Sequence, residues 1–131
     1  SRISLLNYLS YLQKAQALLL LDKEASGIKQ LTKPEKIYLG NTNYAYALGG
    51  EKTDIGNVRE TFFFNQTAVK HKVTYSSQID FTLNETYNFE IGGKNKIQKQ
   101  LAGVENGYLA LDNIEIGFNN EIPFWLFGLM Y

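Results

Sequence analysis

The chain has 131 residues, of which 44% are hydrophobic and 14% aromatic, and this predicts a folded domain with a core of its own. Its 13 basic and 13 acidic residues balance, so no overall field attracts nucleic acid or an anionic membrane. The lack of cysteine excludes disulfides, thiolate zinc sites and a cysteine nucleophile, and fits a cytoplasmic location. The apolar runs at 15–21 and 122–131 are too short to span a bilayer, so we expect no membrane partner.

The first 39 residues predict a helix, a strand, a polar loop and a second strand. Apolar side chains recur at helical spacing from residue 1 to about 17, with Ser1 or Ser4 as the cap. Residues 18–21 and 36–39 read as short strands on either side of the polar segment 22–32. This order is that of the second half of a winged helix, so residues 1–39 are expected to be the C-terminal part of such a domain.

Residues 40–131 predict helices alternating with strands. We expect a short helix at 41–48, capped by Asn41 or Thr42, and a longer one at 58–70, capped by Asn57. A basic helix is expected at 94–103. Strands are expected at 72–77, 79–83, 87–91, 107–111 and 114–118. The resulting fold class is α/β (α+β), with a mixed sheet flanked by helices.

The C-terminal segment is the most apolar part of the chain. Residues 122–131 are predicted to form buried strand structure, because so dense an apolar segment exposed on a monomer would aggregate. The side chains expected to be largely buried are Phe124, Trp125, Leu126, Phe127 and Leu129.

Two neighbouring predicted strands carry the acidic residues that suggest chemistry. Apolar and polar residues alternate strictly in 79–83 and 87–91, so pairing of these strands would place Asp80 and Glu90 on one face. Lysines follow just beyond, and two carboxylates beside amines can hold a divalent metal next to a phosphate. The alternative is that both acids are the solvated faces of strands. Since close carboxylates repel, the pair should either bind a cation or have one raised pKa.

The order of helix, three-stranded meander carrying Asp and then Glu, helix and strand resembles the core of the PD-(D/E)XK nuclease superfamily. More specifically, five segments resemble the C-terminal domain, of unknown function, of a group of bacterial and archaeal AAA-type ATPases. These segments are 33–39, 56–66, 80–81, 89–96 with 99–100, and 122–128. The resemblance implies a restriction-endonuclease-like domain at 40–131 after a winged-helix remnant at 1–39. It also implies that an ATPase module of a longer parent protein is a partner. No phosphate-binding G-K-[ST] loop follows Gly49 and Gly50, so no ATP site is expected.

The resemblance also implies a set of site residues. Asp80 and Glu90 match the two metal-binding acids, for Mg²⁺ or Mn²⁺, and Glu60 matches an auxiliary acid on the first helix. Gln100 matches a polar residue on the helix after the motif. The motif has a lysine two residues after its second acid, where this chain has glycine. A bend at Gly92-Gly93 would return Lys94 or Lys96 to the site.

Three functions remain open at this point. A nuclease-like nucleic-acid-binding or interaction module without cleavage, with DNA as a partner, is favoured by Gly92 and by the neutral net charge. An active Mg-dependent nuclease would use Asp80 and Glu90, with Lys94 or Lys96 as the electrostatic partner. The third function is that of a purely structural cap on the ATPase.

Overall fold

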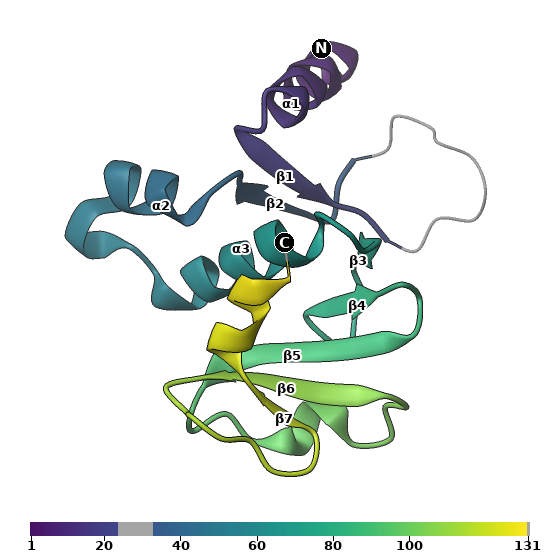
Figure 1. The fold of residues 1–131 in the computed structure, drawn as a ribbon. Helices are drawn as coiled ribbons and strands as arrows, with labels where there is room; N and C mark the ends of the chain where they lie inside the picture. Colours follow the sequence, from purple (N-terminus) through teal and green to yellow (C-terminus); the bar gives the residue numbers. More distant parts are fainter. Residues whose placement is uncertain (24–32, 131) are drawn as a thin grey trace.

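The computed structural model describes residues 1–23 and 33–130 and shows a mixed α/β fold (Figure 1). The predicted polar loop lies for the most part outside the described residues. The N-terminal elements are α1 (Arg2–Lys14), β1 (Leu18–Leu21), β2 (Lys36–Leu39), α2 (Thr42–Gly49), the 3₁₀ turn η1 (Gly50–Lys52) and α3 (Ile55–Thr67). The remaining elements are β3 (Val73–Thr74), β4 (Phe81–Leu83), β5 (Tyr87–Gly93), η2 (Gln98–Leu101), β6 (Gly107–Asp112), β7 (Glu121–Pro123) and η3 (Phe124–Leu129).

The predicted mixed sheet is confirmed. Its five strands lie in the order β3-β4-β5-β6-β7. The first three strands are antiparallel, whereas β5 pairs with β6, and β6 with β7, in parallel. In this register Phe81 lies opposite Phe89, and Glu90 lies opposite Leu109. A separate antiparallel hairpin is formed by β1 and β2.

Aromatic rings fill the face of the sheet on which α3 packs. Phe63 of α3 is fully buried, and its ring centroid lies 5.1 Å from that of Phe81 and 5.2 Å from that of Phe89. Leu21 and Tyr38 of the β1–β2 hairpin belong to the same core cluster. The hairpin and the five-stranded sheet therefore share one hydrophobic core, while the domain boundary expected at residue 39 remains a prediction.

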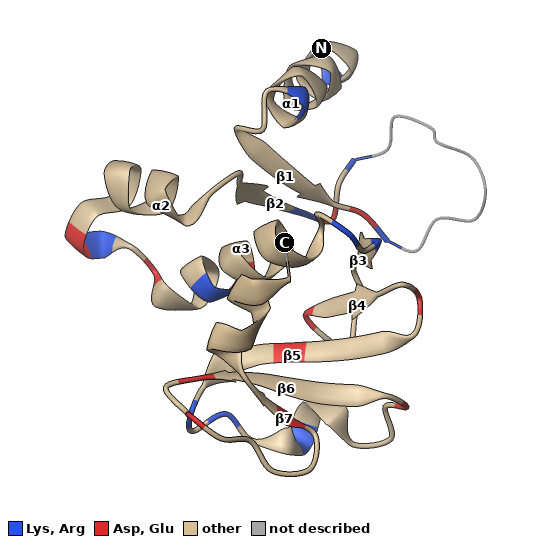
Figure 2. Cartoon of the chain, in the orientation of Figure 1, with Lys and Arg blue, Asp and Glu red and all other residues tan. Residues whose placement is uncertain are grey.

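The opposite face of the sheet is also covered. A second apolar cluster consists of Ile79, Leu101, Leu109 and Leu111. Because side chains alternate along a strand, Glu90 points to this second face, away from Phe89 and Ile91. Glu90 is only 1% exposed, so the reading of this acid as part of a solvated strand face is wrong. Elsewhere on the chain, basic and acidic residues are interspersed (Figure 2).

The helices begin close to where they were predicted. Ser1 caps α1 and Asn41 caps α2, as expected. The cap of α3 is Asp54, whose Oδ1 accepts a hydrogen bond of 2.9 Å from the N–H of Gly56. Asn57, the predicted cap, lies inside the helix, because Asp54 offers an equally good capping side chain one turn earlier. No side chain of the predicted apolar stripe of α1 is buried: Leu6 and Leu9 are half-buried, and Leu5 and Leu12 are exposed.

The predicted helix at 94–103 is wrong. Strand β5 continues through Gly92 and Gly93, which pair with Leu111 and Asp112 of β6. The chain then turns, with the N–H of Lys96 bonded to the carbonyl of Gly93, and only the 3₁₀ turn η2 follows. Residues 94–103 therefore form turns and a single 3₁₀ turn in place of the predicted helix.

Two predicted strands also differ from the structure. The strand expected at 72–77 is reduced to the two residues of β3. The alternating segment 114–118 is not a strand, and Ile116 and Phe118 are both 73% exposed. Residues 114–118 form part of the connection from β6 to the parallel strand β7. The segment therefore does not pair with a strand, although its residues alternate.

The C-terminal segment turns into the 3₁₀ helix η3 after three residues of strand. Phe124 and Phe127 are buried, because the three-residue period of a 3₁₀ helix brings them to the same side. Trp125 and Leu129 are 57% and 65% exposed, and Leu126 is also exposed. The prediction of burial is therefore wrong for these three side chains. No helix among the described residues is long and apolar enough to cross a membrane.

Burial in η3 generates a stability prediction with a matched control. Phe127 contacts the rings of Phe63 at 4.8 Å and Phe89 at 5.7 Å, so Phe127→Ala should lower the free energy of unfolding by about 3–5 kcal/mol. Trp125→Ala, which removes an exposed ring two residues away, should cost less than about 1 kcal/mol. Urea denaturation followed by circular dichroism measures both. Similar losses for the two variants would contradict the placement of η3.

Candidate functional site

The two acids of the motif meet where β4 and β5 pair. Asp80 immediately precedes β4, and Glu90 lies in the middle of β5. Asp80 Oδ2 accepts a hydrogen bond of 2.9 Å from the backbone N–H of Ile91, the residue after Glu90. This bond holds the Asp80 carboxylate beside the strand that carries Glu90.

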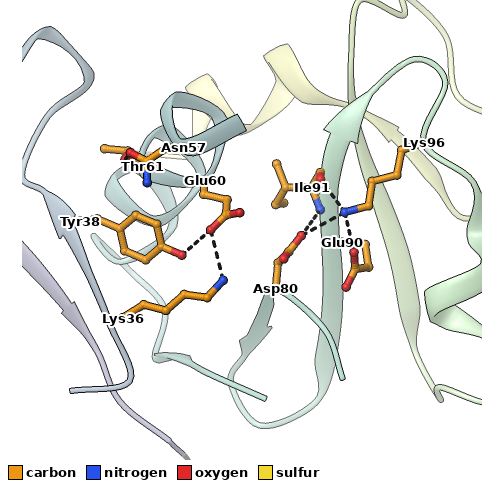
Figure 3. A network of polar contacts seen from close by, with 9 residues as sticks. All are labelled: Lys36, Tyr38, Asn57, Glu60, Thr61, Asp80, Glu90, Ile91 and Lys96. Atoms are coloured by element: carbon orange, nitrogen blue, oxygen red, sulfur yellow. Dashed lines mark hydrogen bonds and ion pairs between the residues drawn. The ribbon is translucent and has the colours of Figure 1, made fainter. Parts of the chain in front are cut away.

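A single ammonium lies between the two carboxylates (Figure 3). Lys96 Nζ is 3.2 Å from Asp80 Oδ2, 2.6 Å from Glu90 Oε2 and 2.7 Å from the carbonyl oxygen of Ile91. Its contact with Glu90 is an ion pair whose angles depart from those of a directed hydrogen bond, and Glu90 Oε2 has no other polar partner in the described part of the chain. The ammonium thus donates hydrogen bonds to Asp80 and to the Ile91 carbonyl, and it forms an ion pair with Glu90.

The Gly92-Gly93 pair makes room for two cationic side chains. A Cβ atom at position 92 would lie 2.7 Å from Lys96 Cβ and closer still to its Cδ, so the aliphatic stem of Lys96 occupies the space of a side chain there. On the opposite face of the strand, the guanidinium of Arg59 lies 3.6 Å from a Cβ built at Gly93 and pairs with Asp112 at 3.0 Å. Of the two lysines expected to reach the acids, it is Lys96 that contacts Asp80 and Glu90. The chain brings it there by a turn after β5 and not by a bend at Gly92-Gly93 within the strand.

Burial and neighbouring charge together set the protonation of this site. Burial is the main cause of the raised pKa of Glu90, and the negative charge of Asp80 adds to it, while Lys96 acts in the opposite direction. For Lys96, burial acts to lower the pKa, but its contacts with Glu90 and Asp80 outweigh this and leave the pKa raised above its ordinary value. Lys96 therefore stays positively charged at neutral pH.

Glu60 belongs to a second polar cluster beside Asp80. The hydroxyl of Tyr38 donates a hydrogen bond to Glu60 Oε2, and Lys36 Nζ lies 3.3 Å from the same oxygen (Figure 3). Burial raises the pKa of Tyr38, and the charges of Glu60 and Asp80 raise it further, so the phenol stays neutral. Glu60 is thus held by β2, and its carboxylate is not among the contacts of Lys96.

Sequence reasoning missed Lys36 and Tyr38 as partners of Glu60. Their spacing of two residues on a strand places both side chains on one face of β2, which is the signal that could have found them. The side chains of Lys94 and Gln100 are exposed, and no ion pair or hydrogen bond joins either to Asp80 or Glu90 in the part of the chain that the structure describes.

The oxygen ligands that the site offers are all in contact with Lys96. The carboxylates of Asp80 and Glu90 and the carbonyl of Ile91 are the kind of oxygen that Mg²⁺ and Mn²⁺ bind. These three oxygens already surround the ammonium of Lys96. Within residues 1–23 and 33–130, no group of three or more His, Cys, Asp or Glu side chains gathers to hold a metal.

No family model, curated protein or solved structure matches this chain. The resemblance of the sequence to the nuclease superfamily and to the ATPase domain therefore remains a prediction.

The raised pKa of Tyr38 predicts that the domain loses stability at alkaline pH. Above pH 10 a tyrosine in the unfolded chain loses its proton, whereas folded Tyr38, with its raised pKa, keeps it. The free energy of unfolding should therefore fall as pH rises, by up to about 1.4 kcal/mol per pH unit for this proton. Tyr38→Phe should show a shallower fall, measured by urea denaturation at several pH values. Tyr44→Phe, at an exposed position on α2, is the control and should match the wild type. Equal slopes for all three proteins would contradict the assignment.

Proposed function

We propose that this domain is a restriction-endonuclease-like interaction module of an AAA-type ATPase that does not cleave nucleic acid. The observation that carries the proposal is the ammonium of Lys96, which engages both motif acids and the carbonyl of Ile91. Carboxylates held in this way are not free to bind a metal or to position an attacking water. The side chain of Glu90 is also only 2% exposed, so a phosphodiester in solution has little access to it.

The surface of α1 supports a protein partner. Although none of its residues is buried, α1 carries large apolar side chains, and a helix of this kind gains stability by packing against another surface. The exposed ones are Ile3, Leu5, Tyr8, Tyr11 and Leu12. We propose that they contact the ATPase module of the parent protein, with residues 1–39 as a winged-helix remnant between the two. Duplex DNA is a weaker candidate, because basic and acidic residues are interspersed over the fold (Figure 2).

One specific observation favours a second candidate, an active Mg-dependent nuclease. The stem of Lys96 fills the space of a side chain at position 92, which is where the nuclease motif places its lysine. Lys96 would then be the residue that stabilises charge on the phosphate. The two candidates differ in whether this lysine leaves the acids free when substrate is present.

Cleavage assays separate the two candidates. Wild-type protein incubated with linear or supercoiled DNA and Mg²⁺ or Mn²⁺ should leave the DNA intact, as should Asp80→Asn and Glu90→Gln. The expectation follows from the engagement of both acids by Lys96. Metal-dependent cleavage by the wild type that both substitutions abolish would establish the nuclease and reject the proposed function.

The interaction surface can be tested through α1. The double variant Leu5→Ser with Leu12→Ser should keep the melting temperature of the domain nearly unchanged, since both side chains are exposed. It should weaken binding to the ATPase module of the parent protein, supplied as a separate chain, by at least about tenfold. Calorimetry measures the affinity, and Gln13→Ala, also exposed on α1, is the control. Unchanged affinity of the double variant would exclude α1 as the docking surface.

A further inference from the structure

We propose that the ammonium of Lys96 is a built-in cation that takes the place of a divalent metal, and that Gly92 is the position that admits it. The inference rests on the non-cleaving part of the proposed function and explains it physically. It makes the domain a nuclease-like protein with a closed, metal-independent acidic site, from which removal of one side chain would uncover a metal site.

The partners of the ammonium are those of a hard cation. Two carboxylate oxygens and a backbone carbonyl oxygen lie 2.6 to 3.2 Å from Lys96 Nζ. Two of these oxygens accept hydrogen bonds from the ammonium, and the third, Glu90 Oε2, forms an ion pair with it. Asp80 Oδ2 is fixed in addition by the N–H of Ile91, and Glu90 is held by the strand that carries it. The oxygens around Lys96 Nζ thus come from the backbone as well as from side chains.

The ammonium and a metal cannot occupy this place together. A divalent ion would sit about 2.0–2.6 Å from the same oxygens, which places it within van der Waals contact of Nζ and against a like charge. Lys96 is moreover part of the chain, only six residues after Glu90, so its local concentration exceeds that of any free metal ion.

Gly92 is required by the path that Lys96 takes across the strand. A methyl group at position 92 would collide with the stem of Lys96 near its own Cβ, where the side chain has least freedom to move. A methyl group at Gly93 would meet Arg59 at the ordinary contact distance of 3.6 Å. Neither glycine has a positive φ, so alanine fits the backbone at both positions. Gly92→Ala and Gly93→Ala are therefore a matched pair that differs only in the fate of Lys96.

The first experiment titrates the protein with Mn²⁺ in a calorimeter. Lys96→Met keeps the aliphatic stem but removes the charge, and it should bind Mn²⁺ at least about tenfold more tightly than the wild type. Lys94→Met removes an exposed lysine from the same turn and should behave as the wild type. Adding Asp80→Asn to Lys96→Met should abolish the gained binding. Equal Mn²⁺ affinity in wild type and Lys96→Met would overturn the proposal.

The second experiment needs no metal and uses the wild-type protein. Lysines are acetylated with a limiting reagent, and the modification of each is followed by mass spectrometry. Lys96 should react at least about tenfold more slowly than exposed Lys94, because its ammonium must first leave three oxygens. In Gly92→Ala its rate should approach that of Lys94, and in Gly93→Ala it should stay slow. Equal rates for Lys94 and Lys96 in the wild type would overturn the proposal whether or not the variants fold.

These results are separate from those that test the proposed function. Wild-type protein that binds Mn²⁺ as tightly as Lys96→Met yet leaves DNA intact would reject the built-in cation alone. Wild-type protein that cleaves DNA with a metal would reject the proposed function itself.

Discussion

A carboxylate buried in the centre of a sheet constrains much of this structure. Glu90 lies between two paired strands, and taking such a charge out of water costs several kcal/mol unless a partner compensates it. The partner is Lys96, and its position dictates the turn after β5 and the absence of a side chain at Gly92. The loop from β5 to β6 is therefore shaped by electrostatics as well as by the connection that it makes.

A second interaction ties the N-terminal hairpin to this site. Tyr38 and Lys36 of β2 both contact Glu60 of α3, and Tyr38 also packs against Phe64 and Phe81 in the core. The Asp80 charge acts on the Tyr38 phenol, so the two polar clusters are electrostatically coupled.

Much of the fold could be predicted because it depends on local patterns. Alternation in 79–83 and 87–91 identified the hairpin that brings Asp80 to Glu90, and short polar residues marked the starts of α1 and α2. The predictions that were wrong share one cause: a local sequence pattern does not show which segment, if any, will pack against it. Residues 114–118 alternate without a neighbouring strand, and Trp125 is apolar but lies on the outer side of η3. In α1 the apolar stripe is at most half-buried among the described residues.

The sequence by itself determined the mixed α/β class, the two acids and the lack of a lysine at position 92. These depend on residue identity and on the period of the strand, which neighbours in the chain carry. Only the tertiary structure decided that Glu90 is buried, because Leu109, which lies opposite it in the sheet, comes from a later strand. It likewise decided that Lys96 rather than Lys94 reaches the acids, since that choice depends on the turn after Gly93 and on the space above Gly92.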